Sequence, residues 1–486
     1  NTAIGHDSSL SITTGGENTS LGINSLRTAT TGSYNTALGG GALQATTTAS
    51  NNTAVGYNSL NVNTTGTSNT AVGYQALDAN TTANENTAVG YSAGGAITTA
   101  VQNVTMGDSA LSALTTGHYN IAIGSQAGAA LVAGTENTFV GFLSGRYTGS
   151  ADHPDYNTGF GSRTLYANTT GEHNVAVGAY ALNANTTASN NTGVGYQALS
   201  ANTTGAGNTA VGKDALAVNT TAGNNVAVGW LAMTSNSTGA ANVAVGRSAL
   251  GANTTASDNI AIGHIALGSN TTGASNTAVG YTALTASTTA GSNTAVGHRA
   301  LTSVTTGAQN TAIGKDAGDV ITTGDSNICI GRESDPSANN TSEIVIGNSV
   351  TGKGDNTGFI YPPGGGSMYQ GSNATAWAQT SDERIKKNIE DNTTGLDAIN
   401  QIRVRNFEYR TEDEITDFEN PASAVVHKEG IQVGVIAQEI ETILPDVIYE
   451  ESTGVKTLDA DNITWYLVNA IKELSAKVED LEKQLN

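Results

Sequence analysis

The sequence has little of what enzymes and nucleic-acid-binding proteins depend on. Of its 486 residues only 13% are charged and 5% aromatic, and there are six prolines and one cysteine. The lone Cys329 excludes an internal disulfide and a cysteine-rich metal site. The net charge of −21 argues against a nucleic-acid partner, because such binders present basic patches. No apolar run is long enough to span a bilayer, so we expect no membrane insertion. We also expect no cofactor.

Glycine, asparagine, threonine and alanine dominate instead, with 59 glycines alone. Such a composition is typical either of disorder or of a repetitive β-array. The charge is uneven: residues 381–486 hold 23 acidic and 11 basic side chains, and the preceding 380 residues hold 18 and 9. This shift predicts a domain boundary near residue 380. Because the sequence starts with Asn1 inside a repeat and shows no signal peptide, we expect it to be a fragment that lacks its natural N-terminal part.

A repeat of 17 residues fills the first part of the chain. Its core, Asn-x-x-apolar-Gly, occurs 20 times, and the period breaks once, with a step of 20 residues between Asn137 and Asn157. The consensus is N-T-A-V-G-Y-x-A-L-x-A-N-T-T-G/A-x-x, and a degenerate copy, E-I-V-I-G, follows at residues 343–347. A fixed period of this length is the mark of a stacked repeat architecture.

The repeat predicts one short strand and a bend in each copy. Positions two and four share one face of the strand, and the mostly alanine third position makes the other face flat. The glycine suits a bend with positive φ. The leucine at position nine is expected in the core. The Thr-Thr pair suggests a second short strand because threonine is β-branched, and the asparagines between these elements are typical turn residues.

Seventeen residues cannot bury a core alone, but stacked copies can, about 4.8 Å apart. The sequence therefore predicts a mainly β fold, a β-roll or solenoid over residues 1–347, in which the repeated asparagines form a side-chain ladder. Twenty turns predict a rod on the order of 95 Å. With so thin a core in each roll, we expect several chains to lie side by side.

The motif N-T-A-V-G-Y-x-A-L resembles the head repeat of trimeric autotransporter adhesins and similar arrays in phage tail fibres, although the period here is longer than the usual adhesin repeat. The resemblance covers residues 1–347. It implies a left-handed parallel β-roll that assembles as a homotrimer.

The longer unit at the break is a candidate receptor-binding loop. It contains Arg146, Tyr147, Asp152, His153, Asp155 and Tyr156. Aromatic and acidic side chains on a protruding loop suit contact with a carbohydrate or a receptor protein, and the alternative is a tolerated surface insertion. The Asp-His-x-Asp group lacks further ligands to complete a metal shell, so we predict no metal site.

After a Gly/Pro-rich neck at residues 348–380, the pattern becomes that of a small α+β domain. We expect a helical turn or two over residues 382–389, helical spacing over 396–402, a strand over 404–409, and a strand then a helix over 434–444, the helix stopped by Pro445. Over 463–486 a heptad places Ile471, Val478 and Leu485 at a, and Leu467, Leu474 and Leu481 at d. Such a coiled-coil seam needs partner helices.

Three segments of this domain carry a second resemblance: S-D-E-R-I-K-K-N-I (381–389), F-E-Y (407–409) and G-V-I-A-Q-E-I-E-T-I-L-P-D-V-I (434–448). In this order they resemble the intramolecular chaperone domain that ends many phage tailspikes and tail fibres and occurs in some eukaryotic membrane-bound transcription factors. The resemblance implies that the domain trimerises the preceding fibre and then cuts itself off.

Carried over, the resemblance makes Ser381 the nucleophile, Lys386 its base and Thr380–Ser381 the scissile bond. Lys387 is an adjacent alternative base. Many members carry a histidine just before G-x-I-A-Q-E. Here Gln432 stands near that spot and His427 lies further upstream, so the part played by His427 stays open.

The residues themselves allow this chemistry. A serine hydroxyl needs a base, and Ser-Lys pairs are a recurrent solution once desolvation or a cationic neighbour makes the lysine neutral. The alternative is structural: serine followed by two acids and, a turn later, two lysines also makes a good helix N-terminus.

Together these patterns predict a phage tail-fibre fragment, made in the host cytoplasm and carried on the virion. It would bind a host surface glycan or protein and would join other tail proteins through its missing N-terminal part. The alternative is a bacterial trimeric surface adhesin without proteolytic activity. A polysaccharide-degrading enzyme needs a cleft with paired carboxylates, and the regular repeats offer none.

Overall fold

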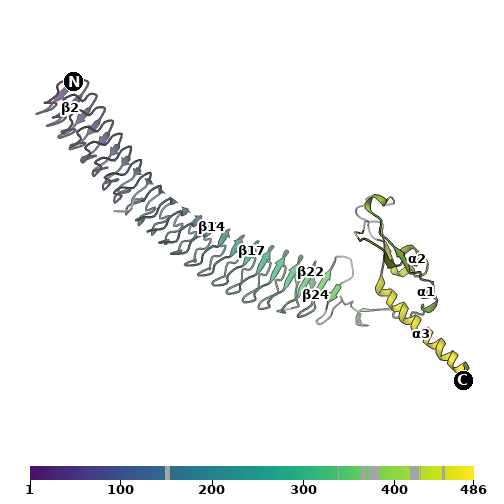
Figure 1. Ribbon diagram of the computed structural model, residues 1–486. Helices are drawn as coiled ribbons and strands as arrows, with labels where there is room; N and C mark the ends of the chain where they lie inside the picture. The colour runs from purple at the N-terminus through teal and green to yellow at the C-terminus, as the bar shows by residue number, and fades with distance from the viewer. Residues whose placement is uncertain are drawn as a thin grey trace. The chain divides into compact units, whose positions relative to one another are not determined.

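The computed structural model describes residues 1–147, 154–337, 339–362, 368–370, 383–415, 426, 428–450 and 455–485. Its contacts divide the chain into two compact units, Asn1–Thr380 and Ser381–Asn486. The first unit is the shaft, a solenoid in which each repeat makes one turn (Figure 1). The fold is therefore mainly β, as predicted, with about 21 turns and few helices.

The strands of the shaft pair with the next turn in parallel, without any shift in register, so that Thr53 lies beside Thr70 and Val55 beside Val72. They are β1 (Thr2–Ile4), β2 (Thr19–Leu21), β3 (Thr36–Leu38), β4 (Thr53–Val55), β5 (Thr70–Val72), β6 (Thr87–Val89), β7 (Val104–Met106), β8 (Ile121–Ile123), β9 (Thr138–Val140), β10 (Thr158–Phe160), β11 (Val175–Val177), β12 (Thr192–Val194), β13 (Thr209–Val211), β14 (Val226–Val228), β15 (Val243–Val245), β16 (Ile260–Ile262), β17 (Thr277–Val279), β18 (Thr294–Val296), β19 (Thr311–Ile313), β20 (Ile328–Ile330) and β22 (Ile344–Gly347).

The core of each turn is built from alanine and leucine. The alanine in the middle of the strand is buried, as Ala54 and Ala210 show, and the leucine at position nine, such as Leu60, fills the space beneath it. Strand positions two and four point the other way and remain half-exposed, as Ile260 and Ile262 do. The sheet therefore carries a long row of partly exposed apolar side chains on its outer face.

A ladder of buried asparagines runs along the shaft, as predicted. The carboxamide oxygen of Asn191 accepts from the backbone N–H of Asn208 at 2.9 Å, and that of Asn208 accepts from Asn225 at 3.0 Å. The amide nitrogen of Asn208 donates to the carbonyl of Ala222 at 2.9 Å. Each turn thus completes the hydrogen bonds of the next one, which turns a stack of short strands into one structure.

A second ladder is formed by asparagines at position twelve, which the sequence suggests only as turn residues. Asn202 donates to Asn185 at 3.0 Å and Asn219 donates to Asn202 at 2.9 Å, all three with fully buried side chains. The predicted second strand is wrong. The Thr-Thr pair lies in bends, although Thr64 N–H still donates to the carbonyl of Thr81 at 2.9 Å.

The repeated glycine is required by both backbone and space. Gly212 has φ +139°, and a Cβ there would lie 2.5 Å from the carbonyl oxygen of Gly229. Any other side chain would strain the bend and push two turns apart. The predicted positive φ at this position is confirmed.

The ladder ends at Glu343, which stands where the earlier turns carry asparagine. Its backbone N–H donates to Asn327 Oδ1 at 3.0 Å, but its buried carboxylate accepts from the N–H groups of Ser337 at 3.0 Å and Gly354 at 2.9 Å. Beyond it the strands continue into the segment that the sequence pattern leaves as a neck. These are β23 (Val350–Thr351), which pairs in parallel with β21 (Ser334–Asp335) of the preceding turn, β24 (Gly358–Tyr361), which is parallel to β22, and β25 (Met368–Gln370), which is antiparallel to β24.

The second unit is a small α+β domain around one apolar cluster. Ile440, Leu444, Val447 and Tyr466 are buried at its centre. Its elements are η1 (Glu383–Ile385), α1 (Leu396–Gln401), β26 (Arg405–Phe407), η2 (Glu412–Glu414), β27 (Gln432–Gly434), α2 (Ala437–Glu441), η4 (Pro445–Val447), β28 (Ile448–Glu450), β29 (Lys456–Leu458) and α3 (Ala460–Leu485). The helical spacing at 396–402 and the long final helix are confirmed. The first predicted helix is a single 3₁₀ turn, and Pro445 opens another such turn directly after α2.

Replacing Asn208 by alanine is expected to weaken the shaft locally. The change removes the acceptor for Asn225 N–H and the donor for Ala222, which leaves two buried groups unpaired at a cost of about 1–3 kcal/mol each. Because turns interact only with their neighbours, hydrogen exchange should accelerate in the turns around residues 191–242 and stay unchanged in distant turns. Val218→Ala, an exposed apolar position nearby, is the matched control. Equal protection in both variants would contradict the role of the ladder.

Candidate functional site

The predicted cleavage seam is only partly described. Thr380 and Ser381, the predicted scissile pair, lie outside the described residues, and so does His427. From Glu383 the chain forms the 3₁₀ turn η1, and Lys386 N–H donates to the carbonyl of Glu383 at 3.1 Å. The side chains of Lys386 and Lys387 are both exposed. The geometry of the predicted Ser-Lys dyad therefore stays a prediction.

The chain that follows the seam is fastened to α3. Asn469 donates through its amide nitrogen to the carbonyls of Asn392 at 2.8 Å and Thr394 at 3.2 Å. One turn further along the helix, Glu473 accepts from the backbone N–H of Leu396 at 3.0 Å. Leu396 is the first residue of α1, so this carboxylate caps a helix that has no side-chain cap of its own. No local sequence pattern indicates this anchor, because its partners lie 75 to 77 residues apart.

Gly395 makes the anchor possible. A Cβ at this residue would lie 2.3 Å from Glu473 Oε1 and 3.1 Å from the backbone nitrogen of Ala470. The chain therefore touches α3 with bare backbone, and a larger residue would force the two apart.

Two of the three resemblance motifs meet in the structure. Strand β26 pairs antiparallel with β27, which places Arg405 opposite Gly434. Arg405 forms a two-pronged ion pair with Glu439 of the G-V-I-A-Q-E motif, at 3.1 and 2.5 Å. The hydrogen bonds from Arg405 lower the pKa of the Glu439 carboxyl below its usual value. This pair locks the start of α2 against the strand pair, so Glu439 of the motif supports the domain together with Arg405, which lies just before the F-E-Y segment.

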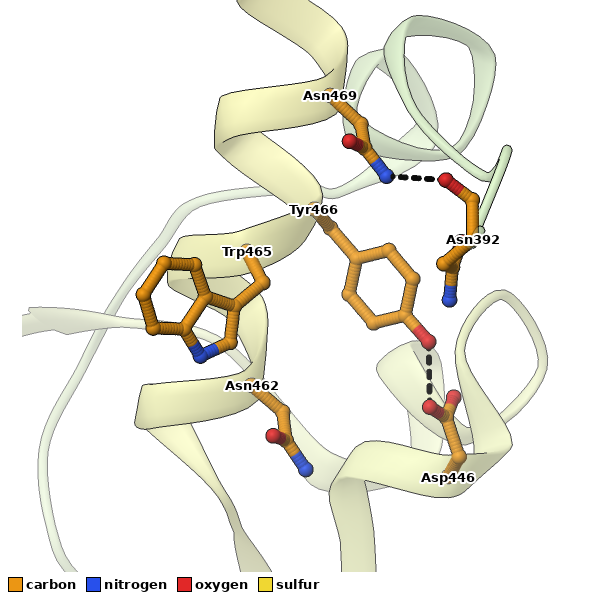
Figure 2. A pocket seen from close by; sticks show the side chains of 6 residues that line it. All are labelled: Asn392, Asp446, Asn462, Trp465, Tyr466 and Asn469. Atoms are coloured by element: carbon orange, nitrogen blue, oxygen red, sulfur yellow. Dashed lines mark hydrogen bonds between the residues drawn. The ribbon is translucent and has the colours of Figure 1, made fainter. Parts of the chain in front are cut away.

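A small pocket of about 230 Å³ opens beside α3 (Figure 2). The Tyr466 hydroxyl donates to Asp446, and this hydrogen bond raises the pKa of the tyrosine. Figure 2 shows the Tyr466 hydroxyl directed toward Asp446, with Asn392 on the same side and the Trp465 side chain on the opposite, left-hand side of the ring. The lining residues are Asn392, Asp446, Asn462, Trp465, Tyr466 and Asn469. The contacts of Tyr466 and Asn469 thus tie two separate segments, residues 392–394 and the turn that contains Asp446, to one helix.

The opposite side of α3 has no covering within the described part of the chain. The predicted a and d residues are all exposed, from 43% for Leu467 and 65% for Ile471 to 86% for Leu485. Tyr466 and Ala470, by contrast, are buried against the domain. The helix therefore has one face that holds the domain together and a second face that is apolar and unpaired.

The insertion in the shaft leaves the stack intact. Asn157 N–H donates to Asn137 Oδ1 at 3.0 Å across 20 residues, and β10 pairs with β9 in the usual register. Asp155 accepts from Thr135 N–H at 2.6 Å, which fastens the returning end of the loop. Tyr156 stacks on His173, with ring centres 5.0 Å apart. Asp152 and His153 of the predicted loop lie outside the described residues.

Arg146 and Tyr147 of the same loop join residues of the following turns. Arg146 lies over the Tyr147 ring at 5.0 Å, and Tyr147 meets Tyr166 edge to face at 4.9 Å. Arg163 lies 5.8 Å from the rings of both Tyr166 and Tyr180. A hydrogen bond with Tyr166 raises the pKa of Tyr147, and the charge of Arg146 opposes that shift. We call these five residues the Arg–Tyr patch.

Sequence reasoning missed three members of the patch, Arg163, Tyr166 and Tyr180. They occupy positions seven and ten of the turns after the insertion, where most turns carry small or uncharged residues. The sequence signal for the patch is this cluster of arginine and tyrosine residues at positions seven and ten, just after the break in the period. Within the described residues Tyr156 stacks on His173 and does not contact the patch, so the described residues of the predicted loop belong to two groups.

The described residues contain neither a membrane-spanning helix nor a metal-binding cluster. No helix there is long and apolar enough to cross a membrane. No group of three or more His, Cys, Asp or Glu side chains there is arranged to hold a metal ion.

One family model matches the first part of the C-terminal unit. Residues 381–449 match the family model Peptidase_S74, described as the chaperone of endosialidase. The match supports a C-terminal chaperone domain of the tail-fibre type, with the character of an autoproteolytic serine peptidase. It covers well under half of the chain and none of the solenoid. No curated protein and no solved structure matches the chain.

Replacing Gly395 by alanine is expected to detach the segment after the seam from α3. Overpacking of this kind costs about 1–3 kcal/mol, so the second unit should unfold at a lower denaturant concentration. Hydrogen exchange at Leu396 should rise while the shaft stays protected. Thr393→Ala, at an exposed neighbouring side chain, is the control. If the two variants are equally stable, the close contact does not matter.

Proposed function

We propose that this chain is part of a phage tail fibre that recognises the host surface. Its C-terminal domain would bring three shafts together and then remove itself by cutting between Thr380 and Ser381. The observation that carries this proposal is the position of the family match, which starts at Ser381, where the second compact unit starts. A chaperone placed directly behind a long repetitive shaft serves the folding of that shaft.

The surface of the shaft supports its assembly as a homotrimer. Strand position four carries an outward-facing apolar side chain in every turn, and position two adds one wherever it is not threonine, as with Ile121, Ile123, Ile260 and Ile262. Monomeric soluble proteins rarely expose apolar patches of such extent. Copies of the same chain carry the same row with the same spacing, so they can cover one another turn by turn. The three shafts would then bury between them the apolar row that a single roll leaves exposed.

The free face of α3 supports the same assembly. Its exposed heptad matches a coiled-coil seam, with β-branched residues at two of the a positions and leucine at d. In isolation that choice favours two strands. The shaft, joined to each helix, would impose three.

The anchor between α3 and the seam offers a route from assembly to cleavage. Asn469 and Glu473 hold residues 392–396 on one side of the helix. Ile471 and Leu474 are exposed on another side, where partner helices would pack. Association of the helices would therefore fix the chain from Asn392, the twelfth residue after the scissile bond. The exposed Lys386 would be desolvated in the same step, which favours the neutral form of a lysine that a base must adopt.

The proposed reaction uses the serine that directly follows the scissile bond. Neutral Lys386 takes the proton of the Ser381 hydroxyl, and Oγ attacks the carbonyl carbon of Thr380. The C–N bond breaks, the α-nitrogen of Ser381 takes up a proton, and Thr380 remains attached through an ester. Water then hydrolyses the ester. The products are a shaft ending in a Thr380 carboxylate and a chaperone beginning at Ser381.

In this proposal the mature fibre belongs to the virion, is made in the host cytoplasm, and contacts a glycan or protein on the host surface. Further tail proteins would attach at its N-terminal side.

Ser381→Ala and Lys386→Ala are each expected to abolish cleavage. Wild-type chain should yield a fragment of 106 residues on a denaturing gel after assembly, and both variants should run as one band of about 49.1 kDa. Lys387→Ala is the control and should still be cut. Release of the fragment from both variants would rule out the dyad, and loss only in Lys387→Ala would make that residue the base.

Charges placed in the helix seam are expected to prevent assembly. Ile471→Lys combined with Val478→Lys would bring like charges together between copies, although both side chains are exposed in the single chain. In a Ser381→Ala background, light scattering should give a trimer for the parent and a monomer for this variant. Glu479→Lys, next to the seam, should remain trimeric. An unaffected trimer in the double variant would show that α3 is not an assembly surface.

A further inference from the structure

The Arg–Tyr patch is a rigid group of side chains at the one irregularity of the shaft. The backbone of each turn holds its members: Tyr147 N–H donates to the carbonyl of Tyr166 at 3.0 Å, and Arg163 N–H to that of Phe142 at 2.9 Å. Tyr180 N–H donates to the carbonyl of Ser162 at 2.9 Å. The rings and guanidinium groups therefore need little further ordering before they bind a ligand.

The two arginines of the patch differ from most other cations of the shaft. In the described residues of the shaft, Arg27, Lys213, Arg299, Lys315 and Arg332 each lie within 4.0 Å of a carboxylate. Within those same ranges no carboxylate pairs with Arg146 or Arg163, whose neighbours are tyrosine rings. In a chain of net charge −21, two arginines that share one group of tyrosine rings, and that pair with no carboxylate of the described residues, form a local site for an anion.

The contacts of the arginines leave their binding edges unused. A guanidinium over an aromatic ring uses its face, while its N–H groups point outward in the plane. These N–H groups match the two oxygens of a carboxylate or phosphate. The Tyr147 ring beside them is half-exposed and offers an apolar surface and a hydroxyl. A charged group flanked by rings with several hydroxyls is the chemistry of an acidic sugar.

The patch also lies outside the surface that we assign to trimer contacts. Its members occupy positions seven, ten and eleven of their turns, after the glycine bend, whereas the apolar row occupies strand positions two and four. A trimer would therefore carry three accessible patches at one height. Three linked weak sites can give strong attachment to a polymer that repeats its charged group.

We propose that the Arg–Tyr patch binds an acidic glycan, a saccharide that bears carboxylate or phosphate groups, on the host surface. Arg146 and Arg163 bind the anionic group, and Tyr147 and Tyr166 contact the sugar ring. This inference rests on the proposed role in host recognition and names the ligand class and the residues. A single-stranded nucleic acid would also suit arginine and aromatic side chains, but the net charge of −21 of the whole chain disfavours a polyanion of that charge density.

The test is binding of the trimeric fibre to an array of oligosaccharides that carry carboxylate, phosphate or sulfate groups or are neutral, with a single-stranded oligo-dT spot beside them. Wild-type fibre should bind carboxylate- or phosphate-bearing members at least tenfold better than neutral ones. Arg146→Gln with Arg163→Gln should lose that preference at least tenfold, and Tyr147→Ala should weaken it.

Arg247→Gln is the matched control, because Arg247 also lies over an aromatic ring, that of Trp230 at 4.9 Å, but has no second arginine in its group. It should bind like the wild type, and unchanged trimer mass and hydrogen exchange would show that all variants fold. Equal binding of neutral and acidic members, a preference for oligo-dT, or an undiminished signal from the double variant would each overturn the proposal. A fibre that trimerises and adheres to host cells despite the double substitution would refute this inference alone. A chain that never trimerises would refute the proposed function.

Discussion

The hydrogen bond from one buried asparagine side chain to the backbone of the next is the interaction on which the shaft depends. A turn of 17 residues with a three-residue strand cannot satisfy its own polar backbone groups or bury its own core. The ladder supplies a partner for the N–H that enters each strand, and it fixes the register because the donor and the acceptor recur at the same position. The alanine core, the glycine bend and the outward apolar row all follow from that fixed stacking.

The regularity explains how much the sequence could predict. Period, parallel stacking, the asparagine ladder, the glycine bend and the buried leucine all follow from a pattern repeated 20 times. The direction of the strand faces did not follow, because threonine, alanine and valine suit either side of a thin sheet. The burial of Asn202 and Asn219 could not be predicted either, because asparagine is typical both of exposed turns and of buried ladders. The two cases differ only in the residues of the turns above and below.

The functional regions were less predictable, for a different reason. Ser381 and Lys386 were chosen from a resemblance between motifs, while the anchor of the seam depends on Asn469 and Glu473, which no local pattern connects to residues 392–396. The Arg–Tyr patch is likewise assembled by stacking: Tyr147 meets Tyr166 of the next turn, and Arg163 lies beside Tyr180 of the turn after that. In a solenoid, residues that are separated by a multiple of the period lie close together in space. An unusual residue in one turn can therefore be recognised as part of a site only when the turns are aligned with one another.

Glu343 gives the shaft a defined end. An asparagine both accepts a hydrogen bond from the next turn and donates one of its own, so a chain of them has no intrinsic stopping point. A carboxylate only accepts, and that of Glu343 is already engaged by Ser337 and Gly354. A further identical turn, whether from the same chain or from another fibre, would find no such partner there. The asparagine ladder of the shaft therefore stops at a fixed position in the sequence, which separates it from amyloid, where the same kind of ladder grows for as long as monomer is supplied.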